Sequence, residues 1–181
     1  PKQALDFACH PQWTLATLKN GRPKFRNINS VSKDVTVGTR VGQFRREAGR
    51  GHFDWNFLRE FRAQWPHKLI PKGVMCAEDA HNAVDAGADA VYVSNHGGRQ
   101  LGSAPPAISM LPLIREALGP EYPIVFDSGV RSGEDIVRTL ASGAGFVMLG
   151  RPFLYALGAG GAGGLSQLLS LLMNELSTVM A

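Results

Sequence analysis

The sequence predicts an α/β fold, a (β/α)8 TIM barrel of which the chain covers about the C-terminal half, four βα units preceded by a basic loop. Three observations predict this fold. From residue 68 onward, short apolar segments alternate with amphipathic ones, an order typical of parallel strands joined by right-handed crossovers. The segment 77–95 recurs at 133–151. Polar side chains follow all four apolar segments at the same end.

The internal repeat has an offset of 56 residues and needs no gap. AEDAHNAVDAGADAVYVSN aligns with GEDIVRTLASGAGFVMLGR, so that Glu78 falls on Glu134 and Gly87 falls on Gly143. One period contains two βα units, which is the interval at which the packing layers of a (β/α)8 barrel recur. A doubly wound sheet is the competing architecture. Because four units are half a barrel, we expect the other half upstream of Pro1.

The chain is predicted to divide into two domains, 1–67 and 68–181. The first is a basic loop and a helix that precede the fifth strand of the barrel. Residues 1–50 show no clean helical or strand period, which predicts a long loop with at most one short helix. In 54–65, DWNFLREFRAQW, apolar residues recur at helical spacing after Asp54, which can cap the first turn. A helix is therefore expected there.

The second domain is predicted to contain four strands, each followed by a helix. The apolar segments resemble strands that are buried on both faces of a parallel sheet. The helices begin at capping residues such as Ser132, end at glycines such as Gly87, and include one irregularity at Pro112. The expected strands are 68–74, 89–95, 123–129 and 145–151, and the expected helices are 77–88, 106–119, 132–144 and 163–181.

The net charge of +4 conceals an asymmetry between the two parts of the chain. Residues 1–72 carry 14 Lys and Arg against 5 Asp and Glu, whereas residues 73–181 carry 5 against 10. A basic segment can adhere to nucleic acid or to anionic lipid, and a solvated surface is the alternative. Cys9 and Cys76 form no CxxC pair, which fits a reducing compartment such as the cytoplasm. Neither a metal site nor an apolar run of membrane-spanning length is expected.

The candidate functional residues gather where the four predicted strands end. In a (β/α)8 barrel the carboxyl ends of the strands form the active face, so these side chains are expected to share one site. Packing alone does not explain why every strand ends in this way. The candidates are Lys72 on the first strand, Ser94, His96 and Arg99 after the second, Asp127, Gly129 and Arg131 after the third, and Gly150 and Arg151 after the fourth.

These residue types point to the oxidation or deprotonation of a carboxylate-bearing substrate. His96 suits a general base because its unperturbed pKa lies near neutrality, and Arg99 offers a planar fork for a carboxylate. The segments DSGVRSG and LGRP combine small residues, helix starts and arginines, which is typical of a phosphate site. Lys72 can stabilise negative charge on a flat cofactor. The alternatives are a structural histidine, surface salt bridges and a lysine that snorkels to solvent.

SNHGGRQL, the preceding PKGV, DSGVRSG and LGRP strongly resemble the FMN-dependent 2-hydroxy acid oxidase and dehydrogenase family. The spacings match as well, with 24 residues from Lys72 to His96 and 31 from His96 to Asp127. The resemblance is firm over 68–181. In the first part of the chain, HPQW and FDWNFLREFRAQWPHKL most resemble the membrane-associated bacterial members that act on (S)-mandelate or L-lactate.

The resemblance implies FMN as cofactor and oxidation of an (S)-2-hydroxy acid to the 2-oxo acid. It implies that His96 takes the substrate proton and that Arg99 binds the substrate carboxylate. The other candidates would contact FMN: Lys72 and Ser94 near the ring, and Asp127, Gly129, Arg131, Gly150 and Arg151 along the ribityl chain and phosphate. It further implies a homo-oligomer and a basic loop docked on the anionic inner membrane surface, with electrons passing towards quinone.

Two further interpretations stay open on sequence alone. One is a different FMN- or phosphate-binding barrel enzyme of the isopentenyl diphosphate isomerase or glutamate synthase kind, which DSGVRSG and LGRP would allow but HGGRQ disfavours. The other is a binding module without activity, in which the basic first part attaches to lipid or nucleic acid. No nucleic-acid-binding motif in the sequence supports it. Two departures from the family pattern are Gly102, where an aspartate is usual, and Pro71 within the first expected strand.

Overall fold

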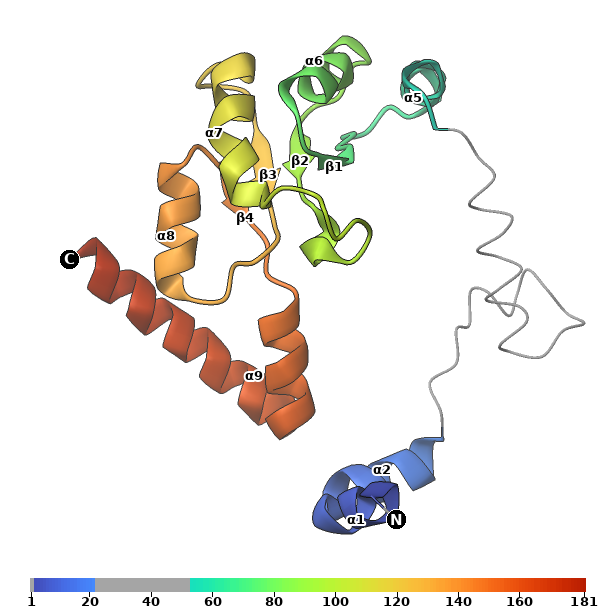
Figure 1. Ribbon diagram of the computed structural model, residues 1–181, viewed down its shortest axis with the longest axis vertical. Coiled ribbons are helices and arrows are strands. Elements are labelled where there is room, and N and C mark those ends of the chain that lie inside the picture. The colour runs from blue at the N-terminus through green and yellow to red at the C-terminus, as the bar shows by residue number, and fades with distance from the viewer. Residues whose placement is uncertain (1, 22–52) are drawn as a thin grey trace, which may run out of the picture. The chain divides into compact units, whose positions relative to one another are not determined.

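The computed structural model describes residues 2–21 and 53–181, which belong to two compact units, Pro1–His52 and Phe53–Ala181. The second unit contains a sheet of four parallel strands in the order β1-β2-β3-β4 (Figure 1). Each strand is followed by a helix, as the sequence predicts. The order of the strands along the sheet is their order in the chain, which is the arrangement of a barrel wall.

The described part of the first unit is helical, so the expectation of a loop with at most one short helix is wrong there. It contains α1 (Lys2–Cys9) and α2 (Pro11–Asn20). Pro11 stands in the first turn of α2, where its missing N–H costs no hydrogen bond. The rings of Phe7 and Trp13 stack at a centroid distance of 5.7 Å and join the two helices. The basic segment 22–52 lies outside the described residues.

Helix α5 (Trp55–Gln64) forms where the sequence predicts a helix, and it belongs to the second unit. The Asp54 carboxylate caps it by accepting a 2.8 Å hydrogen bond from the Phe57 N–H. The Asp89 carboxylate, before β2, accepts hydrogen bonds from Arg62 of α5 and from Lys68. These bonds tie α5 to the sheet, and the hydrogen bond from Lys68 is the main reason that the pKa of Asp89 is lowered.

The strands of the sheet are shorter than the apolar segments that predict them. Pro71 lies immediately before β1, so it interrupts no strand, and its carbonyl accepts a hydrogen bond from the Tyr92 N–H. The strands are β1 (Lys72–Val74), β2 (Val91–Val93), β3 (Ile124–Phe126) and β4 (Phe146–Val147). The helices between them are α6 (Ala77–Asp85), α7 (Ala107–Leu118) and α8 (Gly133–Ala141).

The core lies between the sheet and these helices. Val91 and Val93 of β2 and Ile124 and Phe126 of β3 are fully buried, whereas the residues between them on each strand are half-buried. The helices contribute Leu111 and Ile114 of α7, together with small residues of α6. One face of the sheet is therefore packed against helices, while the alternate side chains, which include Tyr92, point to the other face.

The repeat in the sequence is also a repeat in the structure. Cys76 and Ser132, 56 residues apart, both accept a hydrogen bond from the N–H three residues later and so begin α6 and α8 in the same way. Gly87 and Gly143 both end these helices with positive φ, at 84° and 109°. The equivalent turns show why glycine recurs there, because few other residues adopt this conformation without strain.

Helix α9 (Arg151–Met180) begins twelve residues before the helix expected at 163–181. It bends at Gly160 and Gly161, whose backbone angles are not helical, so the two arms fold back on each other (Figure 1). At Gly164 a Cβ atom would lie 2.3 Å from the Ala156 carbonyl oxygen, so only glycine allows this approach. The glycine-rich stretch before the expected helix is therefore the contact between two helical arms.

By length and composition alone, α9 is apolar enough to cross a membrane. The expectation that no segment of the chain reaches this limit is therefore wrong. Length and composition do not distinguish a spanning helix from an apolar helix of a globular protein. The bend at Gly160 and the packing of the second arm on α8 are features of a folded α/β unit.

The contact between α8 and α9 requires glycine at position 133. A Cβ atom there would lie 2.5 Å from Glu175 Cβ and 2.6 Å from the Leu176 backbone nitrogen. Gly133→Ala is therefore expected to lower the free energy of unfolding by about 1–3 kcal/mol, the usual cost of overpacking. Gly158→Ala is the matched control, because nothing lies within 4 Å of its Cβ position and alanine favours the helix by about 0.5–1 kcal/mol. Urea unfolding measures both, and equal stabilities for the two variants would contradict the packing argument.

Candidate functional site

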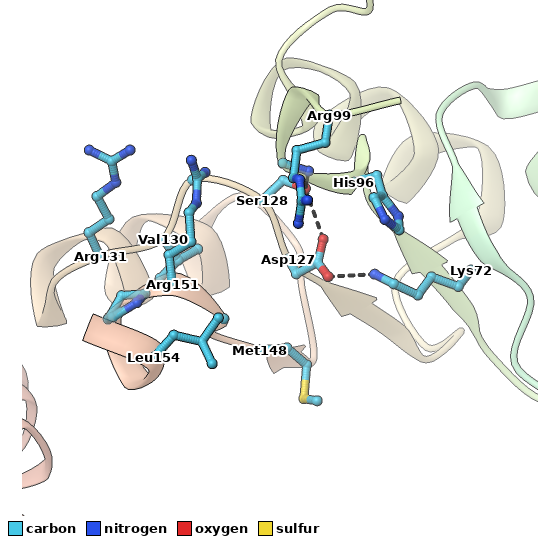
Figure 2. A pocket seen from close by; sticks show the side chains of 14 residues that line it. Lys72, His96, Arg99, Asp127, Ser128, Val130, Arg131, Met148, Arg151 and Leu154 are labelled. Atoms are coloured by element: carbon cyan, nitrogen blue, oxygen red, sulfur yellow. Dashed lines mark hydrogen bonds and ion pairs between the residues drawn. The ribbon is translucent and has the colours of Figure 1, made fainter. Parts of the chain in front are cut away.

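The carboxyl ends of the four strands surround one cavity of about 230 Å³. Figure 2 shows that side chains from the ends of all four strands point towards it. Eight of the nine predicted site residues line the cavity, and Ser94 is buried beside it. The lining residues are Lys72, His96, Gly97, Arg99, Asp127, Ser128, Gly129, Val130, Arg131, Met148, Gly150, Arg151, Pro152 and Leu154.

The Asp127 carboxylate is the polar centre of this cavity. Lys72 Nζ donates to Asp127 Oδ2 at 2.5 Å, and Tyr92 Oη donates to the same oxygen at 2.9 Å. Ser94 Oγ and Ser128 Oγ both donate to the other oxygen, Oδ1. These four donors come from β1, from β2 and its end, and from the loop after β3, so one carboxylate joins three neighbouring strands.

The donors determine the charge state of Asp127 and of Tyr92. Partial burial by itself would raise the pKa of Asp127, but the hydrogen bonds from Lys72, Ser94, Ser128 and Tyr92 outweigh it and lower the pKa below its ordinary value. Burial, followed by the hydrogen bond to Asp127, raises the pKa of Tyr92. Asp127 is therefore a carboxylate and Tyr92 a neutral donor over the physiological pH range.

Lys72 makes two further contacts besides its ion pair with Asp127. Its ammonium donates to Ser94 Oγ at 3.0 Å and lies 3.7 Å from the centroid of the Tyr92 ring. A cation over an aromatic face is attracted by the quadrupole of the ring. Lys72 and Tyr92 are register partners on β1 and β2, which explains why the two side chains meet. The ammonium is thus fixed at the edge of the cavity rather than extended into solvent.

His96 is presented by a tight turn. The 3-10 segment His96–Gly98 follows β2, and its three residues have positive φ values of 58°, 67° and 74°. Asn95 Oδ1 accepts from the Gly98 N–H and closes the turn. Arg99 ends it, and both His96 and Arg99 line the cavity. The two glycines of HGGR therefore allow a histidine and an arginine to face one site.

The part of the cavity at the start of α9 suits an anion. Gly150 precedes α9, whose N-terminus has no capping side chain and no acidic residue in its first turn. Apart from the chain neighbours, no described residue has an atom within 4 Å of the Cβ position at Gly129 or Gly150, so a ligand can approach the backbone there. Within residues 2–21 and 53–181, the guanidinium groups of Arg99, Arg131 and Arg151 have no ion pair or hydrogen bond. Free cations beside an uncapped helix start are typical of a phosphate or carboxylate site.

The sequence reasoning misses three features of this cavity. The first is Ser128, which stands between Asp127 and Gly129 in DSG. The second is Tyr92, which precedes Ser94 by two residues, so that strand alternation places Tyr92 and Ser94 on the same face of the sheet, where both reach Asp127. Apolar Met148 and Leu154 complete one wall (Figure 2). The alternation was the available signal for Tyr92. The hydroxyl of Ser128 has no signal in the sequence beyond its place beside Asp127.

The ion pair and hydrogen bonds of Asp127 predict a pH-dependent contribution to stability. Because the pKa of Asp127 is lower in the folded state, this contribution is fully present above the unfolded pKa of about 4 and is lost as pH falls through the folded pKa. Asp127→Asn is expected to cost about 1–3 kcal/mol at pH 7. The difference from the parent protein should shrink below pH 4. Urea unfolding at several pH values measures it, and a difference independent of pH would contradict this assignment.

Comparisons with known proteins identify the family of this chain. The profile of the family described as FMN-dependent dehydrogenase matches residues 1–181. The (S)-mandelate dehydrogenase of Pseudomonas putida is 39% identical over 182 residues, which are 99% of this chain and 45% of that protein. The L-lactate dehydrogenase of Bartonella tribocorum is 41% identical over 185 residues, 99% of this chain and 47% of that protein.

Solved structures give the same relationship. A crystal structure of the monotopic membrane protein (S)-mandelate dehydrogenase matches with a TM-score of 0.86 and 39% identity, over 98% of this chain and 46% of that chain. A mandelate oxidase structure with (S)-4-hydroxymandelic acid matches with a TM-score of 0.67 and 43% identity, over 71% of this chain and 36% of that one. The chain thus spans about half the length of these relatives, which confirms the prediction of a partial (β/α)8 barrel. It belongs to the FMN-dependent dehydrogenase family.

Proposed function

We propose that the protein containing this chain oxidises an (S)-2-hydroxy acid of the lactate or mandelate type to the 2-oxo acid, with FMN as cofactor. The observation that carries this proposal is the convergence of His96, Arg99 and Lys72 on one cavity whose other side suits an anion. The names of the relatives, (S)-mandelate dehydrogenase and L-lactate dehydrogenase, support the substrate class. HGGRQ disfavours a different FMN barrel, and a module without activity gives no reason for these side chains to converge.

The residues present fit FMN. The uncapped start of α9 at Gly150 and Arg151, together with Gly129 and Arg131, would hold the phosphate. Asp127 would accept from the hydroxyl groups of the ribityl chain. Lys72, fixed by Asp127 and Ser94, would place its ammonium at the ring and stabilise negative charge there. When bound, FMN supplies a two-electron acceptor beside the substrate.

His96 and Arg99 perform the steps that this chain contributes to the substrate. Arg99 binds the carboxylate through its planar fork and so orients the carbon that bears the hydroxyl group. His96 accepts the proton of that hydroxyl as general base. The C–H bond of that carbon breaks as well, its hydrogen and its electron pair would pass to FMN, and the carbon becomes a carbonyl, so the product is the 2-oxo acid. A quinone or an electron-transfer chain is proposed as the final acceptor.

The visible spectrum of the flavin-loaded protein tests these roles. Anaerobic L-lactate or (S)-mandelate is expected to bleach the flavin bands of the parent protein. His96→Gln should keep the flavin but reduce the rate of bleaching about 100-fold or more, because it removes the general base. Arg99→Lys should instead raise the KM for the acid about tenfold, because it loses the bidentate contact.

His81→Gln is the control for these variants, because His81 is exposed on α6, away from the cavity. It is expected to match the parent protein. Flavin bands that remain oxidised in the parent with every 2-hydroxy acid would indicate another flavin barrel. A protein that binds FMN and bleaches normally without His96 would contradict the assignment of the base.

We further propose that the first unit attaches the protein to the cytoplasmic face of the inner membrane. Helices α1 and α2 expose Leu5, Phe7, Trp13, Leu15 and Leu18 to solvent. An exposed apolar helical surface is typical of a segment that inserts into the headgroup region of a bilayer. The basic charge of residues 1–72 adds attraction to anionic lipid. The monotopic membrane character of the matching mandelate dehydrogenase supports this proposal.

Sedimentation with vesicles that contain phosphatidylglycerol tests the membrane proposal. Trp13→Ser is expected to weaken vesicle binding about tenfold, because Trp13 is 54% exposed and would lose apolar contact with the acyl region. Leu113→Ser, which changes a 52% exposed side chain on α7, should leave binding unchanged. High salt should weaken binding of the parent protein. Equal binding of both variants, or no binding to vesicles at all, would overturn the proposal.

A further inference from the structure

Ser128 adopts a backbone conformation that disfavours a serine. Its φ is 92°, in the region that glycine enters freely and residues with a Cβ atom enter at a cost. Among the described residues, His96 is the other non-glycine residue with positive φ, and both line the cavity. Strained conformations of this kind persist where the surrounding structure holds them, and they cluster at functional sites. Glycine would avoid this strain, so the contacts that matter here are those that the Ser128 hydroxyl makes and glycine could not make.

Two serine hydroxyls connect the His96 turn to one carboxylate oxygen. Ser94 Oγ donates to Asp127 Oδ1 and accepts from the His96 N–H at 3.1 Å. Ser128 Oγ donates to the same oxygen at 2.8 Å and accepts from the Gly97 N–H at 3.2 Å. The N–H groups of the neighbouring residues His96 and Gly97 are thus each bound by a serine hydroxyl that donates to Asp127 Oδ1. We name this set, Ser94, Asp127 and Ser128, the serine clamp.

The charge of Asp127 decides which way the two hydroxyl groups of the serine clamp donate their protons. A hydroxyl can donate or accept, but a carboxylate only accepts, so both hydroxyls must turn their protons towards Asp127. Their lone pairs then face the N–H groups of His96 and Gly97. The lowered pKa of Asp127 keeps the carboxylate ionised at neutral pH. The orientation of both hydroxyls is therefore fixed without any contact to the imidazole itself.

Apart from the two serines, the His96 turn is held by hydrogen bonds among residues 95–99 and by one from Asn95 Nδ2 to the Pro105 carbonyl. Its three successive positive φ values depart from those of a regular helix, so it depends on such side-chain contacts to keep its shape. Ser128 also stands in the wall between the cavity and a neighbouring one, which Gly97, Gly129 and Arg151 line as well. The contact between Ser128 and Gly97 thus joins the loop after β3 to the loop after β2.

We propose that Ser128 is a positioning residue, whose hydroxyl binds the Gly97 N–H and thereby fixes the turn that presents His96 to the substrate. Its importance for catalysis rests on the proposed function. Ser128 would touch neither the substrate nor the proton that moves. Its effect is on the orientation of the base. This orientation affects the rate of proton transfer strongly and the binding of the acid only weakly.

Amide hydrogen exchange in the 181-residue chain tests the contact without any substrate. Ser128→Ala removes the hydroxyl and keeps the unfavourable φ, whereas Ser128→Gly removes the hydroxyl and the strain together. Both variants are expected to raise the exchange rate of the Gly97 amide about tenfold, the equivalent of one hydrogen bond. The His96 amide, bound to Ser94, should change less. Ser109→Ala, on the exposed face of α7, is the control and should change neither.

The glycine variant separates positioning from stability. It is expected to unfold at the same urea concentration as the parent protein within about 10%, while its Gly97 amide exchanges faster. If Ser128→Ala does not fold, Ser128→Gly decides the question alone. Unchanged exchange at Gly97 in the glycine variant would overturn the proposal.

Kinetics in the flavin-loaded protein give the second measurement. Ser128→Gly should lower kcat for the 2-hydroxy acid about 10- to 100-fold and leave KM within about twofold, because Arg99 is unchanged. A rise in KM with constant kcat would overturn the positioning role. If no acid reduces the flavin of the parent protein while Gly97 exchange responds to the variants, the proposed function fails and the contact of Ser128 with the turn stands.

Discussion

The site depends on the hydrogen bonds that the Asp127 carboxylate accepts. This carboxylate lies at the end of β3 and accepts from Lys72, Tyr92, Ser94 and Ser128. A partly buried carboxylate is costly unless donors surround it, and these donors are themselves partly buried polar groups that need an acceptor. The carboxylate and its donors therefore offset one another's cost of burial. The ends of three strands are held together by polar contacts at the edge where the apolar core stops.

The same contacts give the cavity its electrostatic character. Asp127 neutralises one cation, Lys72, and leaves the guanidinium groups of Arg99, Arg131 and Arg151 unpaired within the described part of the chain. Unpaired cations beside a helix start make a site for an anion. The phosphate of FMN and the carboxylate of a 2-hydroxy acid, as proposed above, would satisfy this demand. The geometry, the family and the charge thus agree.

Most of the fold could be predicted from the sequence because its signals are local. Apolar segments such as VYV and IVF become strands, Asp54 and Ser132 cap helices, and the repeat of 56 residues recurs in the caps of α6 and α8. The first unit and α9 were predicted less well. Pro11 begins a helix that the absence of a clear period had hidden, and the glycines near Gly160 form a bend within a helix rather than a loop.

The sequence by itself determined which residues reach the site, because strand ends and spacing are written in the order of the chain. It placed His96, Arg99 and Asp127 on one face, and eight of the nine expected residues line one cavity. Only the tertiary structure decided how they are held. The contact between Ser128 and Gly97 joins residues 31 apart, and the bond from Tyr92 to Asp127 joins residues 35 apart. No local pattern encodes such pairs, because they exist only after parallel strands have packed side by side.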